Sequence, residues 1–180
     1  MAFGLDAISA QFAGRTEPLR SDTHLPLMKS LELALNVAAA DGLPLVVTVA
    51  ASDERLSALN RRLVPSAWKE SLAGQFIYVA VRDAKQLKPL TGEVSGEGIL
   101  LVEPDQFGLS GKVLKRLSLD ADRQTIESSM NDVVTTFPRD HKDHNSHVRL
   151  GIQLGIDWKS QIPESDPMSV RARQRVRGSN

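Results

Sequence analysis

The stretch that decides the fold is VVTVAASDERLSAL, residues 46–59. Its first half is a β-branched run, and the Ser-Asp-Glu that follows is typical of the first turn of a helix. Because the apolar residues are continuous, we expect a strand buried on both faces. Many α/β proteins place their chemistry where such a strand meets a helix, since the first helical amides point outward there. Ser52, Asp53, Glu54 and Arg55 are therefore candidate site residues.

The residues before this stretch predict another helix. Apolar residues recur at helical spacing from Leu27 to Ala38, and Pro26 suits a first helical turn. Gly42 is suited to end that helix as a C-cap.

A second helix should begin near Asp53, with Leu56 among its apolar residues. Pro65 should kink or split it, because proline breaks the helical hydrogen-bond ladder. Ser66 would then cap a second piece, in which Trp68 and Leu72 pack inward.

The second half of the chain predicts strands and one more helix. Residues 75–83 are typical of a strand, and residues 84–97 form a turn-rich connection. Residues 98–119 indicate two strands joined by a Pro-Asp and Gly-rich hairpin. Asp120 should open a helix that Pro138 stops. Its apolar residues share one face: Ile126, Met130, Val133, Val134 and Phe137.

This order of elements predicts an α/β fold. Helical crossovers demand parallel pairing early, and the hairpin demands antiparallel pairing late, so we expect a mixed sheet with helices on both faces. The 180 residues suffice for one domain with tails. We divide the chain into an N-terminal extension (1–24), a domain (25–137) and a C-terminal extension (138–180).

Two segments resemble the thioredoxin-like fold. GILLVEPDQFGLSGKVLKRLSL, residues 98–119, is similar to that family's final hairpin. AAADGLPLVVTVAAS, residues 38–52, is similar to its first helix and central strand. The resemblance covers roughly residues 25–137.

The resemblance implies a degenerate active site. It places Ser52 at the family's tryptophan, with Asp53 and Leu56 at its two cysteines. Thiolate chemistry needs both thiols, which a carboxylate and an isobutyl group cannot replace. The family's cis-proline position is Glu97, followed by Gly98, and we expect a trans bond there. The resemblance therefore implies a redox-inactive member, neither oxidoreductase, peroxidase nor glutathione transferase.

Asp53 is interpreted as a helix N-cap, and Glu54 suits the helix dipole. Arg55 is expected in solvent or paired with a neighbouring acid. The alternative is a hydrolytic or binding site that uses Asp53 and Glu97 as paired carboxylates, because the resemblance implies that these positions lie close together.

Three histidines recur every third residue in RDHKDHNSH, at His141, His144 and His147. Imidazoles with nearby carboxylates are good ligands for zinc, nickel or copper, so a metal site is one interpretation. The spacing is poor for it, since neither a helix nor an extended chain gathers all three on one side. The alternative is a polar linker.

Residues 148–158, VRLGIQLGIDW, alternate strictly between apolar and other residues, which predicts a strand. It would pair with its own sheet or, by β-augmentation, with another chain.

Four arginines then alternate near the C-terminus and suit phosphates or an acidic groove. The protein-binding candidates are Val148, Leu150, Ile152, Leu154, Ile156, Trp158, Arg171, Arg173, Arg175 and Arg177.

Composition narrows the function further. Net charge is zero, and cysteine is absent, which removes disulfides and thiolate metal sites. We find no transmembrane-length segment and no secretory signal pattern, so we expect a cytoplasmic protein.

The leading hypothesis is a non-enzymatic binding module without cofactor, a structural or accessory subunit of a protein assembly. The alternatives are a chaperone or assembly factor, a metal-handling protein, self-association, and nucleic-acid binding through the arginine tail.

Overall fold

The computed structural model describes residues 24–139 and 143–156. In chain order the elements are β1 (Leu27–Met28), α2 (Leu31–Asp41), β2 (Leu45–Val49), α3 (Asp53–Ala67), β3 (Ile77–Val81), the 3-10 turn η1 (Ala84–Leu87), β4 (Leu90–Thr91), β5 (Gly98–Pro104), β6 (Gly111–Leu117), α4 (Arg123–Thr136) and α5 (His144–Gln153).

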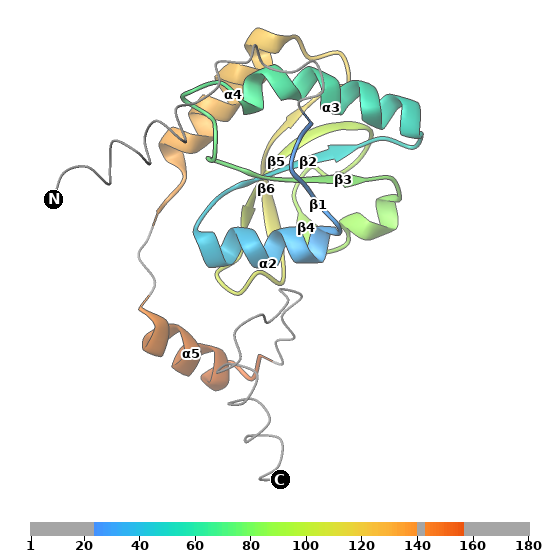
Figure 1. Ribbon diagram of the computed structural model, residues 1–180. Helices are drawn as coiled ribbons and strands as arrows, with labels where there is room; N and C mark the ends of the chain where they lie inside the picture. The colour runs from blue at the N-terminus through green and yellow to red at the C-terminus, as the bar shows by residue number, and fades with distance from the viewer. Residues whose placement is uncertain (1–23, 140–142, 157–180) are drawn as a thin grey trace, which may run out of the picture.

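The strands form one six-stranded sheet with the order β1-β3-β2-β5-β6-β4 (Figure 1). β1, β3 and β2 run parallel to one another, β5 is antiparallel to β2 and to β6, and β4 joins β6 in parallel. In the centre of the sheet, Val47 lies opposite Val79 on one side and Leu100 on the other. The expectation of a mixed sheet, with parallel pairing early and a hairpin late, is confirmed.

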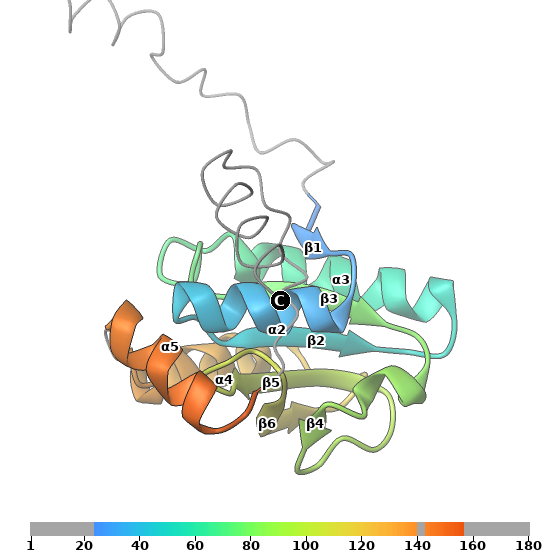
Figure 2. The same cartoon turned by 90° about the horizontal axis from the view of Figure 1, so that it is seen from below.

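The central strand β2 is buried on both faces, as its continuous apolar run predicted. Successive side chains of a strand point to opposite faces. Val46 accordingly belongs to a core shared with Leu59 of α3 and Met130 of α4, whereas Val47 belongs to a core shared with Leu35 of α2. Figure 1 shows the sheet between α2 on one side and α3 and α4 on the other, and Figure 2 shows α2 running alongside β2. Helices therefore cover both faces, as expected.

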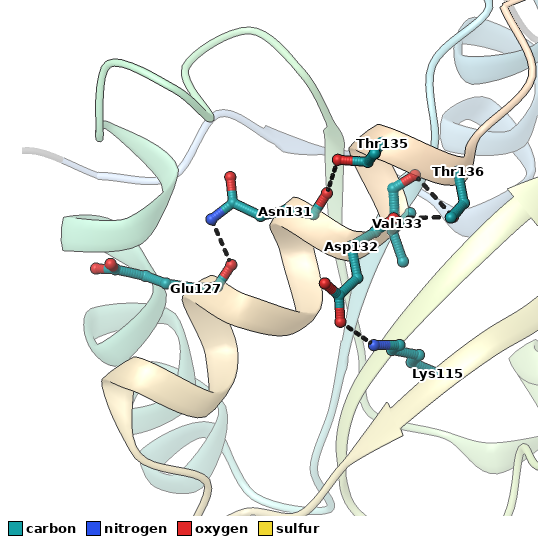
Figure 3. Close-up of polar contacts among 7 residues, drawn as sticks. All are labelled: Lys115, Glu127, Asn131, Asp132, Val133, Thr135 and Thr136. Atoms are coloured by element: carbon teal, nitrogen blue, oxygen red, sulfur yellow. Dashed lines mark hydrogen bonds and ion pairs between the residues drawn. The ribbon is translucent and has the colours of Figure 1, made fainter.

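α4 lies next to β6 with its polar side chains turned back onto its own backbone (Figure 3). Asn131 donates to the carbonyl of Glu127 at 2.8 Å, and Thr135 and Thr136 likewise donate to carbonyls four residues earlier. Lys115 of β6 bonds Asp132 at 2.6 Å. The helix ends before Pro138, as expected, but its N-cap is Asp122 and not Asp120.

The predicted start of the first helix was wrong. Leu27 and Met28 form β1, and Ser30 caps α2 by accepting a hydrogen bond from the Leu33 amide at 3.1 Å. The cap fixes the start because its side chain satisfies an amide that the helix leaves unpaired. Gly42 ends α2 in the left-handed conformation, as expected.

The expected split of the helix at Pro65 was wrong, and Ser66 lies inside α3 instead of capping a second piece, whereas the kink given as the alternative is not tested. α3 continues through Pro65 to Ala67, and Trp68 donates to the carbonyl of Val64 at 3.2 Å, so helical bonding resumes beyond the proline. Leu72 is buried as predicted, but Trp68 is 46% exposed instead of packed inward.

The expected strand at 148–158 is contradicted, because residues 144–153 form the helix α5. Asp143 caps it by accepting from the Ser146 amide at 2.8 Å. Gly155 closes it with φ 64°, and the Ile156 amide bonds the Gly151 carbonyl. The alternating leucines and isoleucines also recur four residues apart, so the pattern satisfied a helix as well as a strand.

Candidate functional site

The sheet pairing brings Glu97 to the start of α3. β5 runs antiparallel beside β2 with Gly98 opposite Val49, so the residue before Gly98 must lie next to the end of β2. Glu97 accepts a hydrogen bond from the Ala51 amide at 2.8 Å, and its other oxygen bonds the Arg55 guanidinium at 2.7 Å. Ser52, Asp53 and Glu97 therefore border the same strand–helix junction, as the sequence suggested.

The interpretation of Asp53 as the N-cap is wrong, because Ser52 is the cap. The Ser52 hydroxyl accepts from the Arg55 amide at 3.3 Å, and Ser52 has the extended backbone of a capping residue. Asp53 is the first helical residue, and its carboxylate pairs with Arg82, after β3, at 2.9 Å. Leu56 lies buried in the core between α3 and the sheet.

The loop that carries Glu97 is held by Arg116 of β6. The Nη2 atom of its guanidinium donates to the backbone carbonyl of Glu97 at 3.3 Å, and the Nη1 atom lies 3.5 Å from the Glu93 carboxylate. Gly96 has φ +86°, and a Cβ there would lie 2.6 Å from this guanidinium. The positive φ favours glycine here, and any larger residue would also displace the Arg116 guanidinium. The bond before Glu97, between Gly96 and Glu97, is trans, as expected.

Sequence reasoning missed Arg82 and Arg116 as members of this site. Neither lies near residues 52–56 or 97 in the chain, and only the strand order brings β3 and β6 to the same edge. Arg55 was expected to pair with a neighbouring acid, and it does so with Glu97.

Hydrogen bonds at the junction favour the ionised forms of Glu97 and Glu54 by lowering their pKa values. The hydrogen bond from the Ala51 amide, followed by that from Arg55, holds the pKa of Glu97 below its ordinary value. Amide and Ser52 hydrogen bonds likewise lower the pKa of Glu54. A general acid near neutral pH needs the opposite shift. Asp53 and Glu97 border one junction, but each carboxylate is paired with its own arginine.

A groove of about 470 Å³ lies beside Glu97, between the end of β2 and the 84–97 connection. Its wall is largely apolar, with Val49, Leu87 and Leu90 among the lining residues, and the cations Arg82 and Lys88 also line it. Pockets that hold ligands in proteins have volumes of this order and a similar apolar lining.

The structure places the histidines only in part. His147 stacks on Phe107 of the β5–β6 turn, with ring centroids 4.6 Å apart. His144 is the first residue of α5, and His141 falls outside the described residues. Within residues 24–139 and 143–156, no group of three His, Asp or Glu side chains is placed to hold a metal ion. The three-histidine site stays a prediction.

The protein-binding candidates also lie partly inside and partly outside the described residues. Those on α5 are exposed: Val148 at 44%, Leu150 at 36%, Ile152 at 74% and Leu154 at 59%. Ile156 is half-buried just after the helix. Trp158, Arg171, Arg173, Arg175 and Arg177 lie outside the described residues.

Among the helices of the described residues, none is long and apolar enough to cross a membrane. The chain matches no family model, no curated protein and no solved structure.

Proposed function

We propose that this chain is a non-catalytic protein-binding module with a thioredoxin-like domain, acting as a structural or accessory subunit of a larger protein assembly. Support for the thioredoxin-like part is topological. A central strand pairs in parallel with β3 and antiparallel with β5, a helix follows it directly, and a hairpin and a helix complete the domain. These features agree with the resemblance of residues 38–52 and 98–119.

The observation that carries the proposal is the ion-paired junction at the end of β2. Where a redox protein of that type would hold its thiols, Asp53 pairs with Arg82, and Glu97 pairs with Arg55 and with the Ala51 amide. The sequence holds no cysteine. A lowered pKa suits a permanently charged, structural Glu97 better than proton transfer. An ion-paired junction without thiols, in a sheet of this strand order, supports a binding role over a redox role.

Native mass spectrometry of the protein purified gently from its source tests the proposal. We expect a particle much heavier than the 19.7 kDa chain, with the chain present at fixed stoichiometry. Recovery of the lone chain in all preparations would contradict it.

The groove beside Glu97 favours a second candidate, a chaperone or assembly factor that grips a client segment there. An apolar wall with two cations suits a short peptide better than a reaction centre. This candidate predicts transient, substoichiometric complexes. Lys88→Glu would weaken them and leave a permanent assembly unchanged.

A further inference from the structure

α5 contacts the domain at Phe107, in the turn between β5 and β6. His147 and Gly151, one helical turn apart, both face Phe107 of the β5–β6 turn. The His147 ring stacks on Phe107, and a Cβ on Gly151 would lie 3.3 Å from the same ring. Glycine at this position lets the helix backbone approach the aromatic ring closely.

Two apolar rows flank this contact, and both are exposed. Val148 and Ile152 lie four residues apart on one side of the contact line, and Leu150 and Leu154 lie four apart on the other. Ile152, at 74% exposure, is the most exposed of the four. The Phe107 ring lies against His147 and Gly151, and the four aliphatic side chains on either side of this line are exposed to water, which is unfavourable for them.

The opposite side of α5 is polar and carries positive charge. Asn145, Arg149 and Gln153 follow one another at four-residue spacing, and all three are exposed. Arg149 is the only Lys, Arg, Asp or Glu side chain within α5 itself. A complementary surface would therefore be acidic.

We propose that α5 docks its Val148–Ile152 row into an apolar groove of a partner protein whose rim carries carboxylates facing Arg149. This is helix-in-groove recognition, in which residues four apart anchor the helix. The inference rests on the proposed function and names the surface and the partner chemistry. A second copy that packed its α5 against this one would present Arg149 with an arginine instead of a carboxylate. A nucleic acid would leave Ile152 uncovered.

Site-specific photo-cross-linking in the source cells tests this surface. The full chain carries p-benzoylphenylalanine at Ile152 or, as the matched control, at the neighbouring Gln153 on the polar row. We expect position 152 to cross-link at least about fivefold more strongly than position 153. The cross-linked partner peptide should be apolar with Asp or Glu close by. Cross-links to lipid, to RNA or to a second copy, equal yields at both positions, or no cross-link would overturn the inference.

Arg149→Glu tests the charge, with Arg61→Glu on the exposed side of α3 as the control. We expect the Ile152 cross-link to fall about tenfold for Arg149→Glu, because a like charge would face the acidic rim, and to be unchanged for Arg61→Glu. Equal losses would overturn the acidic-rim part.

If the native particle keeps the chain at fixed stoichiometry but Ile152 does not cross-link, this inference fails and the proposed function stands. If there is no particle, both fail.

Discussion

Two helices of this protein begin in the same way and end up in different surroundings. Asp122 caps α4 by accepting from the Thr125 amide at 2.7 Å, and Asp143 caps α5 by accepting from the Ser146 amide at 2.8 Å. α4 then buries Ile126, Met130 and Val133 to 2% exposure or less. In α5, by contrast, large apolar side chains are exposed, with Val148 at 44% and Ile152 at 74%.

The difference shows that capping and packing contribute separately to the stability of a helix. A cap fixes where a helix begins, but a helix of ten residues is marginal in water, and packing of its apolar face supplies most of its stability. α4 has that packing within the chain. α5 has its cap and the contact with Phe107, while Val148, Leu150, Ile152 and Leu154 stay exposed and form an apolar surface that another molecule could cover.

The largest expected effect comes from removing packing under α4. Met130→Ala should lower the free energy of unfolding by about 2–5 kcal/mol, because it leaves a cavity in a closed core. Ile152→Ala in α5 is the matched variant and should change it by less than about 0.5 kcal/mol. Urea denaturation followed by circular dichroism measures both. A loss of similar size for Ile152→Ala would mean that α5 belongs to the core.

The N-caps give a smaller and sharper contrast. Asp122→Ala should lower the thermal midpoint of the whole domain by a few degrees, because α4 unfolds with the core. Asp143→Ala should leave that midpoint unchanged and weaken only α5, which hydrogen exchange of the residue 147–153 amides would report. If the midpoint fell equally for Asp143→Ala, α5 and the core would unfold as one unit.

Glu97 provides an intermediate case, a segment held by polar contacts instead of packing. Glu97→Gln should lower the thermal midpoint at pH 7 more than Glu93→Gln does. Glu97 has two hydrogen bonds and a side chain 22% exposed, whereas Glu93 is 70% exposed and lies 3.5 Å from its arginine. Thermal melts of the two variants and the wild type measure the difference, and the reverse order would contradict the account.

The same pair predicts a pH dependence. Because folding lowers the pKa of Glu97, its stabilising contribution is complete above the ordinary pKa of glutamate and is lost as the pH falls through the lowered value. The difference in midpoint between wild type and Glu97→Gln should therefore shrink on acidification below that ordinary value. A constant difference from pH 7 down to pH 2.5 would show that the charge of Glu97 does not matter.

Removing the aromatic contact should have the smallest effect on overall stability. Phe107→Ala deletes the ring under His147 and Gly151, so α5 amides should exchange faster while those of α4 are unchanged. Hydrogen exchange with mass spectrometry resolves the two helices. Unchanged exchange in α5 would show that Phe107 does not hold it.

Much of the domain could be predicted from local patterns. The strand 45–49 has a continuous apolar run, the hairpin around Asp105 has Pro-Asp and Gly turn residues, and α4 has apolar residues at helical spacing. Each pattern favours one structure, and the structure confirms all three. Residues 148–156 fit two periodicities at once, so the sequence alone could not choose between strand and helix. The cap at Asp143 is the local signal that could have decided it.

The candidate site was predictable only in part, for a physical reason. Ser52 and Asp53 lie in one turn, and Glu97 was reached through a resemblance, but which residue pairs with each carboxylate depends on strand order. Arg82 follows β3, and Arg116 lies in β6. Both come to the end of β2 through long-range pairing that no local pattern encodes.

Hydrogen exchange of α5 in the native particle and in the isolated chain tests the central claim most directly. The account predicts that amides of residues 147–153 exchange rapidly in the isolated chain and become strongly protected in the particle, while α4 is protected equally in both. Rapid exchange of α5 in both states, or full protection already in the isolated chain, would contradict the claim that α5 is the surface that binds the assembly.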